Sequence, residues 1–241
     1  MRVLVVIPTY NEAPNIAAVL AAVRAVVVGD IAVVDDGSDD DTAALARRAG
    51  VIVLRHPCNL GIGAAVQTGF LYALQQGYDA VVRVDGDLQH DPAHIPALLE
   101  QLESDGADIV VGSRFLARQG YQSTFVRRVG ILILGVLGAL VGTRVTDPTS
   151  GYWALNRRAL EVLAKFQPDD YPETQSLLVA TRAGCRVREL PVVMQARGAG
   201  RSSIGALQSG FYMVKVILAV LIERLRPRLR PRSRPPTGTG R

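Results

Sequence analysis

The chain has 241 residues, 49% of them hydrophobic, which is enough to bury a sizeable core in one large α/β domain or two small ones. Its two cysteines, Cys58 and Cys185, lack metal-ligand spacing, which argues against a disulfide framework and for a reduced, cytosolic chain. The first eight residues are too short for a signal peptide and predict a buried first strand.

The formal net charge of +5 belongs to the C-terminal end of the chain. Seven arginines and no acidic residue lie in 224–241, and removing those seven charges leaves −2 for residues 1–223. Four prolines prevent this stretch from forming one continuous helix. Either it is a solvated tail, or it binds anionic lipid. Nucleic acid is not expected as a partner, because the tail has no interleaved aromatic residues.

The first half of the sequence alternates apolar runs with amphipathic helical patterns. The predicted strands are Val3–Ile7, Ile31–Val34, Val51–Leu54, Ala80–Val84 and Ile109–Gly112. Predicted helices begin near Pro14, run from Thr42 to about Ala49, and cover Ala64–Gln76 and Ile95–Glu103. The alternation predicts a mainly parallel sheet with helices on both faces.

In such a sheet, ligands bind beyond the carboxyl ends of the strands. Four polar clusters follow predicted strands and are expected to converge there. They are Thr9-Tyr10-Asn11-Glu12, Asp35-Asp36-Gly37-Ser38, Asp85-Gly86-Asp87 and Ser113-Arg114. This convergence favours a ligand site over a set of unrelated polar turns.

Asp85-Gly86-Asp87 ends an apolar strand and places two carboxylates one residue apart. Carboxylate oxygens suit Mg²⁺ or Mn²⁺, which keep coordination positions open for water and phosphate. A metal held there can stabilise a departing diphosphate. The alternative is an acidic turn, since Asp and Gly are ordinary turn residues.

The second half contains two short apolar segments. Val129–Gly142 is uncharged and Phe211–Ile222 contains one lysine, and both fall short of the ~20 residues that span a bilayer. Each is either a core helix or a helix in the membrane interface. The predicted division is a nucleotide-sugar half (1–120), an acceptor half (121–205, with its apolar helix near 129–142), an amphipathic helix (206–226) and a basic, disordered tail (227–241).

Seven motifs in order resemble the family-two inverting glycosyltransferases, and within them the polyprenyl-phosphate sugar synthases of the dolichyl-phosphate mannose synthase type. The motifs are Ile7-Pro8-Thr9-Tyr10-Asn11-Glu12, Val34-Asp35-Asp36-Gly37-Ser38, Asn59-Leu60-Gly61-Ile62-Gly63, Asp85-Gly86-Asp87-Leu88-Gln89-His90, Gly112-Ser113-Arg114-Phe115, Asp147-Pro148-Thr149-Ser150-Gly151-Tyr152 and Glu189-Leu190-Pro191-Val192 followed by Arg197. The resemblance implies the A-type glycosyltransferase fold, which is α/β and Rossmann-like, here with C-terminal membrane-interface helices.

The resemblance also implies roles for individual residues. The residues expected to bind the donor are Pro8, Tyr10, Glu12, Val34, Asp36, Asp85, Gly86, Asp87 and Ser150. Those expected to bind Mg²⁺ or Mn²⁺ are Asp85, Asp87 and Gln89, and the catalytic candidates are Asp87, Arg114, Glu173 and Arg197. Guanidinium groups pair well with phosphate oxyanions, which suits the two arginines.

Three positions depart from the synthases that the chain resembles. Gln175 stands where many relatives have a second acid after the position of Glu173, Ser203 replaces a lysine, and Trp153 replaces an arginine. Glu173 could be a general base, orient the acceptor, or begin a helix with favourable charge. These departures weaken the specific expectation of mannose and dolichyl-type phosphate, but not that of nucleotide-sugar transfer.

The resulting hypothesis is a cytoplasmic enzyme, peripheral to the inner face of the membrane, that transfers a sugar from a nucleotide donor to a polyprenyl phosphate. Three alternatives stay open: transfer to a hydroxyl acceptor, a sugar-nucleotidyltransferase, and a non-enzymatic scaffold that kept the nucleotide fold. A second copy of the chain or a small membrane protein is considered as a partner.

Overall fold

The computed structural model describes residues 1–117, 145–166 and 172–195. The predicted apolar helices near 129–142 and 211–222, the tail and Arg197 lie outside these ranges. The described strands are β1 (Val3–Thr9), β2 (Asp30–Asp35), β3 (Ile52–Arg55), β4 (Ala80–Arg83), β5 (Ile109–Ser113), β6 (Trp153–Asn156) and β7 (Val187–Pro191). The described helices are α1 (Ala13–Arg24), α2 (Thr42–Arg48), α3 (Ile62–Gln75), η1 (Pro92–His94), α4 (Ile95–Ser104), α5 (Arg114–Ala117), α7 (Arg157–Phe166) and α8 (Pro172–Arg182).

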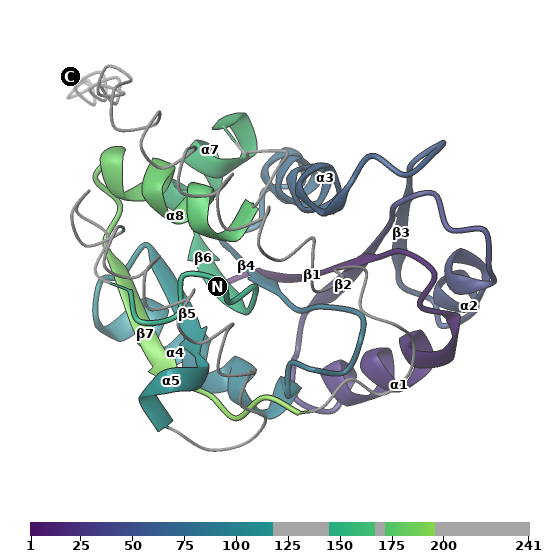
Figure 1. The fold of residues 1–241 in the computed structure, drawn as a ribbon, viewed down its shortest axis with the longest axis horizontal. Helices are drawn as coiled ribbons and strands as arrows, with labels where there is room; N and C mark the ends of the chain where they lie inside the picture. Colours follow the sequence, from purple (N-terminus) through teal and green to yellow (C-terminus); the bar gives the residue numbers. More distant parts are fainter. Residues whose placement is uncertain (118–144, 167–171, 196–241) are drawn as a thin grey trace, which may run out of the picture.

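The strands in the described ranges form one seven-stranded sheet in the order β3-β2-β1-β4-β6-β5-β7 (Figure 1). β6 runs antiparallel to β4 and β5, whereas the other neighbours pair in parallel. The sheet is therefore mixed but mainly parallel. β6, from the predicted acceptor half, lies between two strands of the predicted nucleotide half, so the sheet joins both halves.

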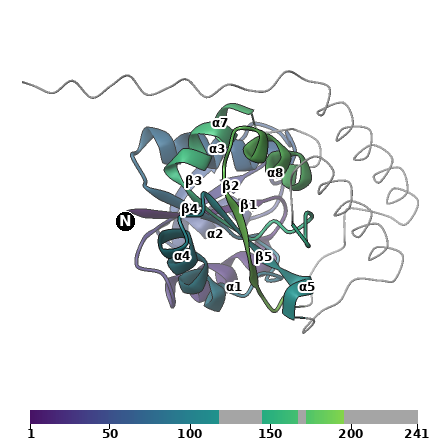
Figure 2. The same ribbon diagram turned by 90° about the vertical axis from the view of Figure 1, so that its left-hand side faces the viewer.

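Helices cover both faces of this sheet (Figures 1 and 2). One buried cluster joins β1 residues Leu4 and Val6 to α3, α7 and α8, and the other joins Val5 and Ile7 to α1 and α4. The alternation follows from the two-residue period of a strand, which sends neighbouring side chains to opposite faces. Because both faces are covered, the central strands are largely apolar rather than alternating.

The contact between α3 and β1 depends on a glycine in the helix. A Cβ added to Gly69 would overlap the side chain of Val6, which is fully buried. We expect Gly69→Ala to lower the free energy of unfolding by about 1–3 kcal/mol, because overpacking a core outweighs alanine's better helix propensity. Urea denaturation checks this, with Gln75→Ala on the exposed end of the same helix as control; an equally stable Gly69→Ala would contradict the packing.

Candidate functional site

The loop that carries Asp85 and Asp87 packs directly on the end of β1. A Cβ added to Gly86 would lie 2.9 Å from Thr9 Cγ2 and 3.4 Å from the Pro8 carbonyl oxygen. Only glycine allows this close approach. The structure thus brings the acidic loop and the first polar cluster together at the carboxyl edge of the sheet, as the sequence predicts.

The polar loops after β1 and β2 are joined by hydrogen bonds. Asn11 N donates to Ser38 Oγ at 2.9 Å, and Asn11 Oδ1 accepts from Asp39 N at 3.0 Å. Glu12 N donates to Thr42 Oγ1 at 2.9 Å. Asn11 has φ 55°, a left-handed conformation that asparagine tolerates better than most residues. Three of the four predicted clusters, at 9–12, 35–38 and 85–87, therefore lie together at the carboxyl edge of the sheet. We call them the polar rim.

Asp36 holds the neighbouring loop in place. Its carboxylate is buried and accepts from Leu60 N at 2.9 Å, Gly61 N at 2.8 Å and His56 Nδ1 at 2.7 Å. The other ring nitrogen of His56 lies 2.9 Å from Thr68 Oγ1. These partners of His56 could not be predicted from the sequence, because the three groups come from separate elements. A direct contact between Asp36 and the donor stays a prediction.

Two of the expected donor-binding side chains lie in the core instead. Val34 is 0% exposed and belongs to the cluster under α3, and Ser150 is 1% exposed with its Oγ donating to the Gly112 carbonyl at 2.6 Å. A contact of either residue with the donor stays a prediction. Tyr10, in contrast, is 44% exposed at the rim.

His90 is buried beneath the Asp85–Asp87 loop and contacts it. Its Nδ1 accepts from Asp85 N at 3.0 Å, its Nε2 lies 3.6 Å from Asp85 Oδ2, and its ring stacks on Tyr152 with centroids 4.7 Å apart. Burial lowers the pKa of His90, so the ring is neutral near pH 7. An accepting Nδ1 places the proton on Nε2, which faces the carboxylate. His90 is thus a hydrogen-bonding loop residue.

The acidic loop offers a metal two carboxylates. Asp87 is 6% exposed and its Oδ1 accepts from Gln89 N at 3.1 Å, whereas the Asp85 side chain is 32% exposed. Within the described ranges, no three His, Cys, Asp or Glu side chains gather to hold an ion. Two carboxylates fit Mg²⁺ or Mn²⁺ bound together with a diphosphate and water, rather than an ion held by protein ligands alone.

Arg83 is a site residue that the sequence analysis missed. It points from β4 toward α8 and is 1% exposed, and its Nη2 donates to Glu173 Oε1 at 2.7 Å and to Asp85 Oδ1 at 3.3 Å. Burial opposes the charge, but the carboxylates of Asp85 and Glu173 outweigh it and raise the pKa of Arg83. The available signal was a lone arginine inside an otherwise apolar strand.

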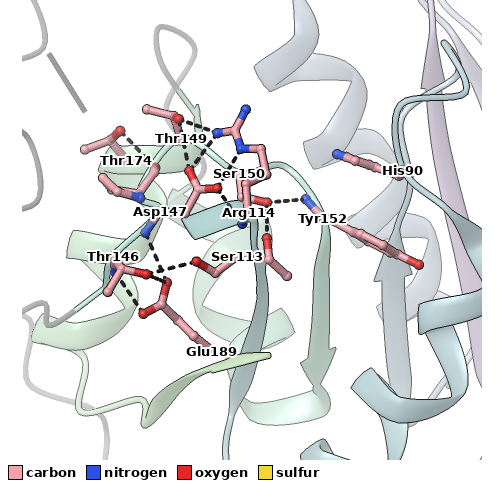
Figure 3. Close-up of polar contacts among 12 residues, drawn as sticks. His90, Ser113, Arg114, Thr146, Asp147, Thr149, Ser150, Tyr152, Thr174 and Glu189 are labelled. Atoms are coloured by element: carbon pink, nitrogen blue, oxygen red, sulfur yellow. Dashed lines mark hydrogen bonds and ion pairs between the residues drawn. The ribbon is translucent and has the colours of Figure 1, made fainter. Parts of the chain in front are cut away.

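Arg114 is tied into a polar cluster beside the site (Figure 3). Its Nε and Nη2 donate to Asp147 at 2.7 and 2.6 Å, and Nη2 also donates to Thr149 Oγ1 at 2.8 Å. Glu189 accepts from Thr146 N at 2.8 Å and from Asp147 N at 3.0 Å. The guanidinium thus faces a buried carboxylate, and a contact with phosphate stays a prediction.

Comparison with known proteins agrees with this architecture. The model of the family described as Glycosyl transferase family 2 matches residues 4–163. An undecaprenyl-phosphate mannosyltransferase from Micrococcus luteus is 34% identical, over 94% of this chain and 98% of the relative. A polyprenol monophosphomannose synthase from Mycolicibacterium smegmatis is 33% identical, over 89% of this chain and 85% of the relative.

Among solved structures, the chain is similar to glucosyl-3-phosphoglycerate synthase from Mycobacterium tuberculosis. In its complex with Mn²⁺ and UDP-glucose, that protein superposes with a TM-score of 0.71 at 26% identity, over 94% of this chain and 80% of that chain. None of the helices in the described ranges is long and apolar enough to cross a membrane.

Proposed function

Because the chain belongs to glycosyl transferase family 2 and is therefore a glycosyltransferase, we propose that it transfers a sugar from a nucleotide-sugar donor to a polyprenyl phosphate, with inversion at the anomeric carbon. The observation that carries the proposal is the packing of the Asp85–Asp87 loop against the polar rim at the end of β1. That arrangement gives a nucleotide diphosphate an acidic metal site beside hydrogen-bonding loops.

The donor would lie along the rim, with Tyr10 and Glu12 toward the nucleoside and Asp85, Asp87 and Gln89 toward the diphosphate. Mg²⁺ or Mn²⁺, when bound, supplies positive charge that stabilises the departing nucleoside diphosphate. Arg114 and Arg197 are proposed to add guanidinium charge near the phosphates.

The acceptor class is proposed from the relatives, two of which are named for transfer to undecaprenyl phosphate or polyprenol phosphate. A lipid phosphate is anionic near neutral pH and can attack the anomeric carbon without losing a proton. A hydroxyl acceptor requires a general base. The basic residues of 224–241 suit a membrane surface that presents such a lipid.

A thermal-shift panel tests the donor half of the proposal. We expect one of UDP-glucose, GDP-mannose or dTDP-glucose to raise the melting temperature in the presence of Mn²⁺, because a ligand that binds only the folded state stabilises it. EDTA should remove the effect. No stabilisation by any nucleotide sugar would contradict a donor site.

A transfer assay tests the acceptor half. With the stabilising donor carrying a radiolabelled sugar, the labelled product should extract into organic solvent and release its sugar in mild acid, as a glycosyl phosphate diester does. An acid-stable or water-soluble product would instead identify a hydroxyl acceptor.

A further inference from the structure

We propose that Arg83 is a positioning residue that fixes the Asp85 carboxylate for the metal–diphosphate group and, by binding Glu173, excludes Glu173 as the general base. This inference rests on the proposed function and deepens it, because a site without that base suits an acceptor that arrives already ionised. Arg83 and Glu173 lie ninety residues apart in the sequence, and their Nη2–Oε1 distance is 2.7 Å.

The surroundings of Arg83 make its position hard to explain by stability alone. Its neighbours on the same face of the sheet, Val81, Trp153 and Leu155, are all fully buried apolar residues. Replacing a buried ion pair by apolar residues of similar volume is often neutral or stabilising. Stability alone therefore gives no reason for a guanidinium at this position, whereas its second carboxylate partner, Asp85, does.

Asp85 accepts a hydrogen bond at one carboxylate oxygen from the protein interior and has a buried ring beside the other. Arg83 Nη2 contacts Oδ1 at 3.3 Å, and His90 Nε2 lies 3.6 Å from Oδ2. The backbone conformation is fixed too, since Asp85 N donates to the same histidine. A carboxylate held this way keeps its orientation before the ligand binds, and groups that orient a metal ligand tune its affinity.

The close packing of Gly151 is an independent observation that supports the positioning role of Arg83. A Cβ there would lie 2.8 Å from Arg83 Nη2 and 3.3 Å from Asp85 Oδ2. The glycine lets the chain after Ser150 pack against both groups at once. Adding a single methyl group at this position should therefore displace the arginine head, the carboxylate, or both.

The ion pair between Arg83 and Glu173 also limits the role that Glu173 can have in the reaction. Its side chain is 16% exposed at the start of α8, and its Oε1 accepts from the Arg83 guanidinium at 2.7 Å. Taking up a proton from an acceptor would break this ion pair. Glu173 therefore positions Arg83.

The experiment compares Arg83→Met, Glu173→Gln and Gly151→Ala with the wild type in Mn²⁺ titrations, read by thermal shift at a fixed concentration of the stabilising nucleotide sugar. We expect Arg83→Met to need about 10–100-fold more Mn²⁺ for half of the shift, the usual loss when a group that orients a metal ligand is removed. Gly151→Ala should shift the titration in the same direction. Arg158→Met is the matched control, because it breaks the Arg158–Asp108 ion pair (3.2 Å) at the opposite edge of the sheet.

Glu173→Gln separates positioning from base catalysis. The amide keeps an oxygen that can accept from Arg83, so we expect kcat to fall less than about tenfold and the KM for the acceptor to be little changed. Loss of a general base instead lowers kcat by about 10²–10⁴-fold. The emission of Trp153, the single tryptophan and fully buried, shows that each variant keeps its core.

The outcomes are distinguishable from failure of the proposed function. If the wild type shows no Mn²⁺-dependent stabilisation by a nucleotide sugar, the proposed function itself is wrong. If the wild type responds but Arg83→Met and Gly151→Ala titrate as it does, the positioning role is wrong. A loss of kcat beyond 10²-fold in Glu173→Gln, with Mn²⁺ dependence intact, would make Glu173 the base and overturn the inference.

Discussion

Asp87→Ala should abolish metal-dependent sugar transfer while leaving the fold intact. The carboxylate is the more buried of the two acidic groups on the loop, and it accepts a local hydrogen bond from Gln89 N at 3.1 Å. Metal stabilisation of a leaving group is worth several kcal/mol, so we expect turnover to fall by about 10³-fold or more. Mn²⁺ should no longer enhance stabilisation by the nucleotide sugar.

The matched control is Asp79→Ala, an exposed carboxylate just before the same strand, at the opposite end of β4. It removes an equal charge and should leave both turnover and Mn²⁺ dependence as in the wild type. Asp87→Asn is a second variant that keeps an oxygen for Gln89 N while weakening the metal ligand. Full turnover in either Asp87 variant would refute the assignment of the metal site.

The first half of the fold could be predicted because its signals are local. Apolar runs bounded by turn residues identified β1 to β5 to within two residues at each end, with β1 ending at Thr9 rather than Ile7. The antiparallel insertion of β6 between β4 and β5 was not predicted. Its four residues carry no periodic signal, and its place depends on pairing with strands about 40 and 70 residues earlier.

The candidate site could likewise be predicted where its signals are local, but not where it depends on contacts between distant elements. Motifs at strand ends predicted the rim and the acidic loop, because the carboxyl ends of parallel strands meet at one edge. Side-chain partners that come from distant elements could not be read from spacing, and so Arg83 with Glu173, and His56 with Asp36, were missed. Val34 was expected at the pocket from the resemblance; its side chain is buried in the cluster under α3, and its contact with the donor stays a prediction.

The polar cluster beside the site should dominate the stability of the loop that follows residue 144. Asp147 is 0% exposed and accepts from the backbone and guanidinium of Arg114, while its own N–H donates to Glu189 (Figure 3). Burial of a charged pair is costly, but removing one partner is worse, because the other charge is left in the interior. The cluster is thus a point where one substitution has a large effect.

Asp147→Ala should therefore lower the free energy of unfolding by about 3–5 kcal/mol, a large share of the 5–15 kcal/mol typical of a domain. Urea denaturation followed by Trp153 emission measures it. Glu161→Ala is the control, because it breaks an exposed ion pair with Arg157 (3.5 Å) and should cost less than about 1 kcal/mol. Arg114→Met combined with Asp147→Leu should recover part of the loss, since no buried charge is then left unpaired. An Asp147→Ala variant as stable as Glu161→Ala would contradict this expectation and show that the Arg114 guanidinium does not depend on Asp147.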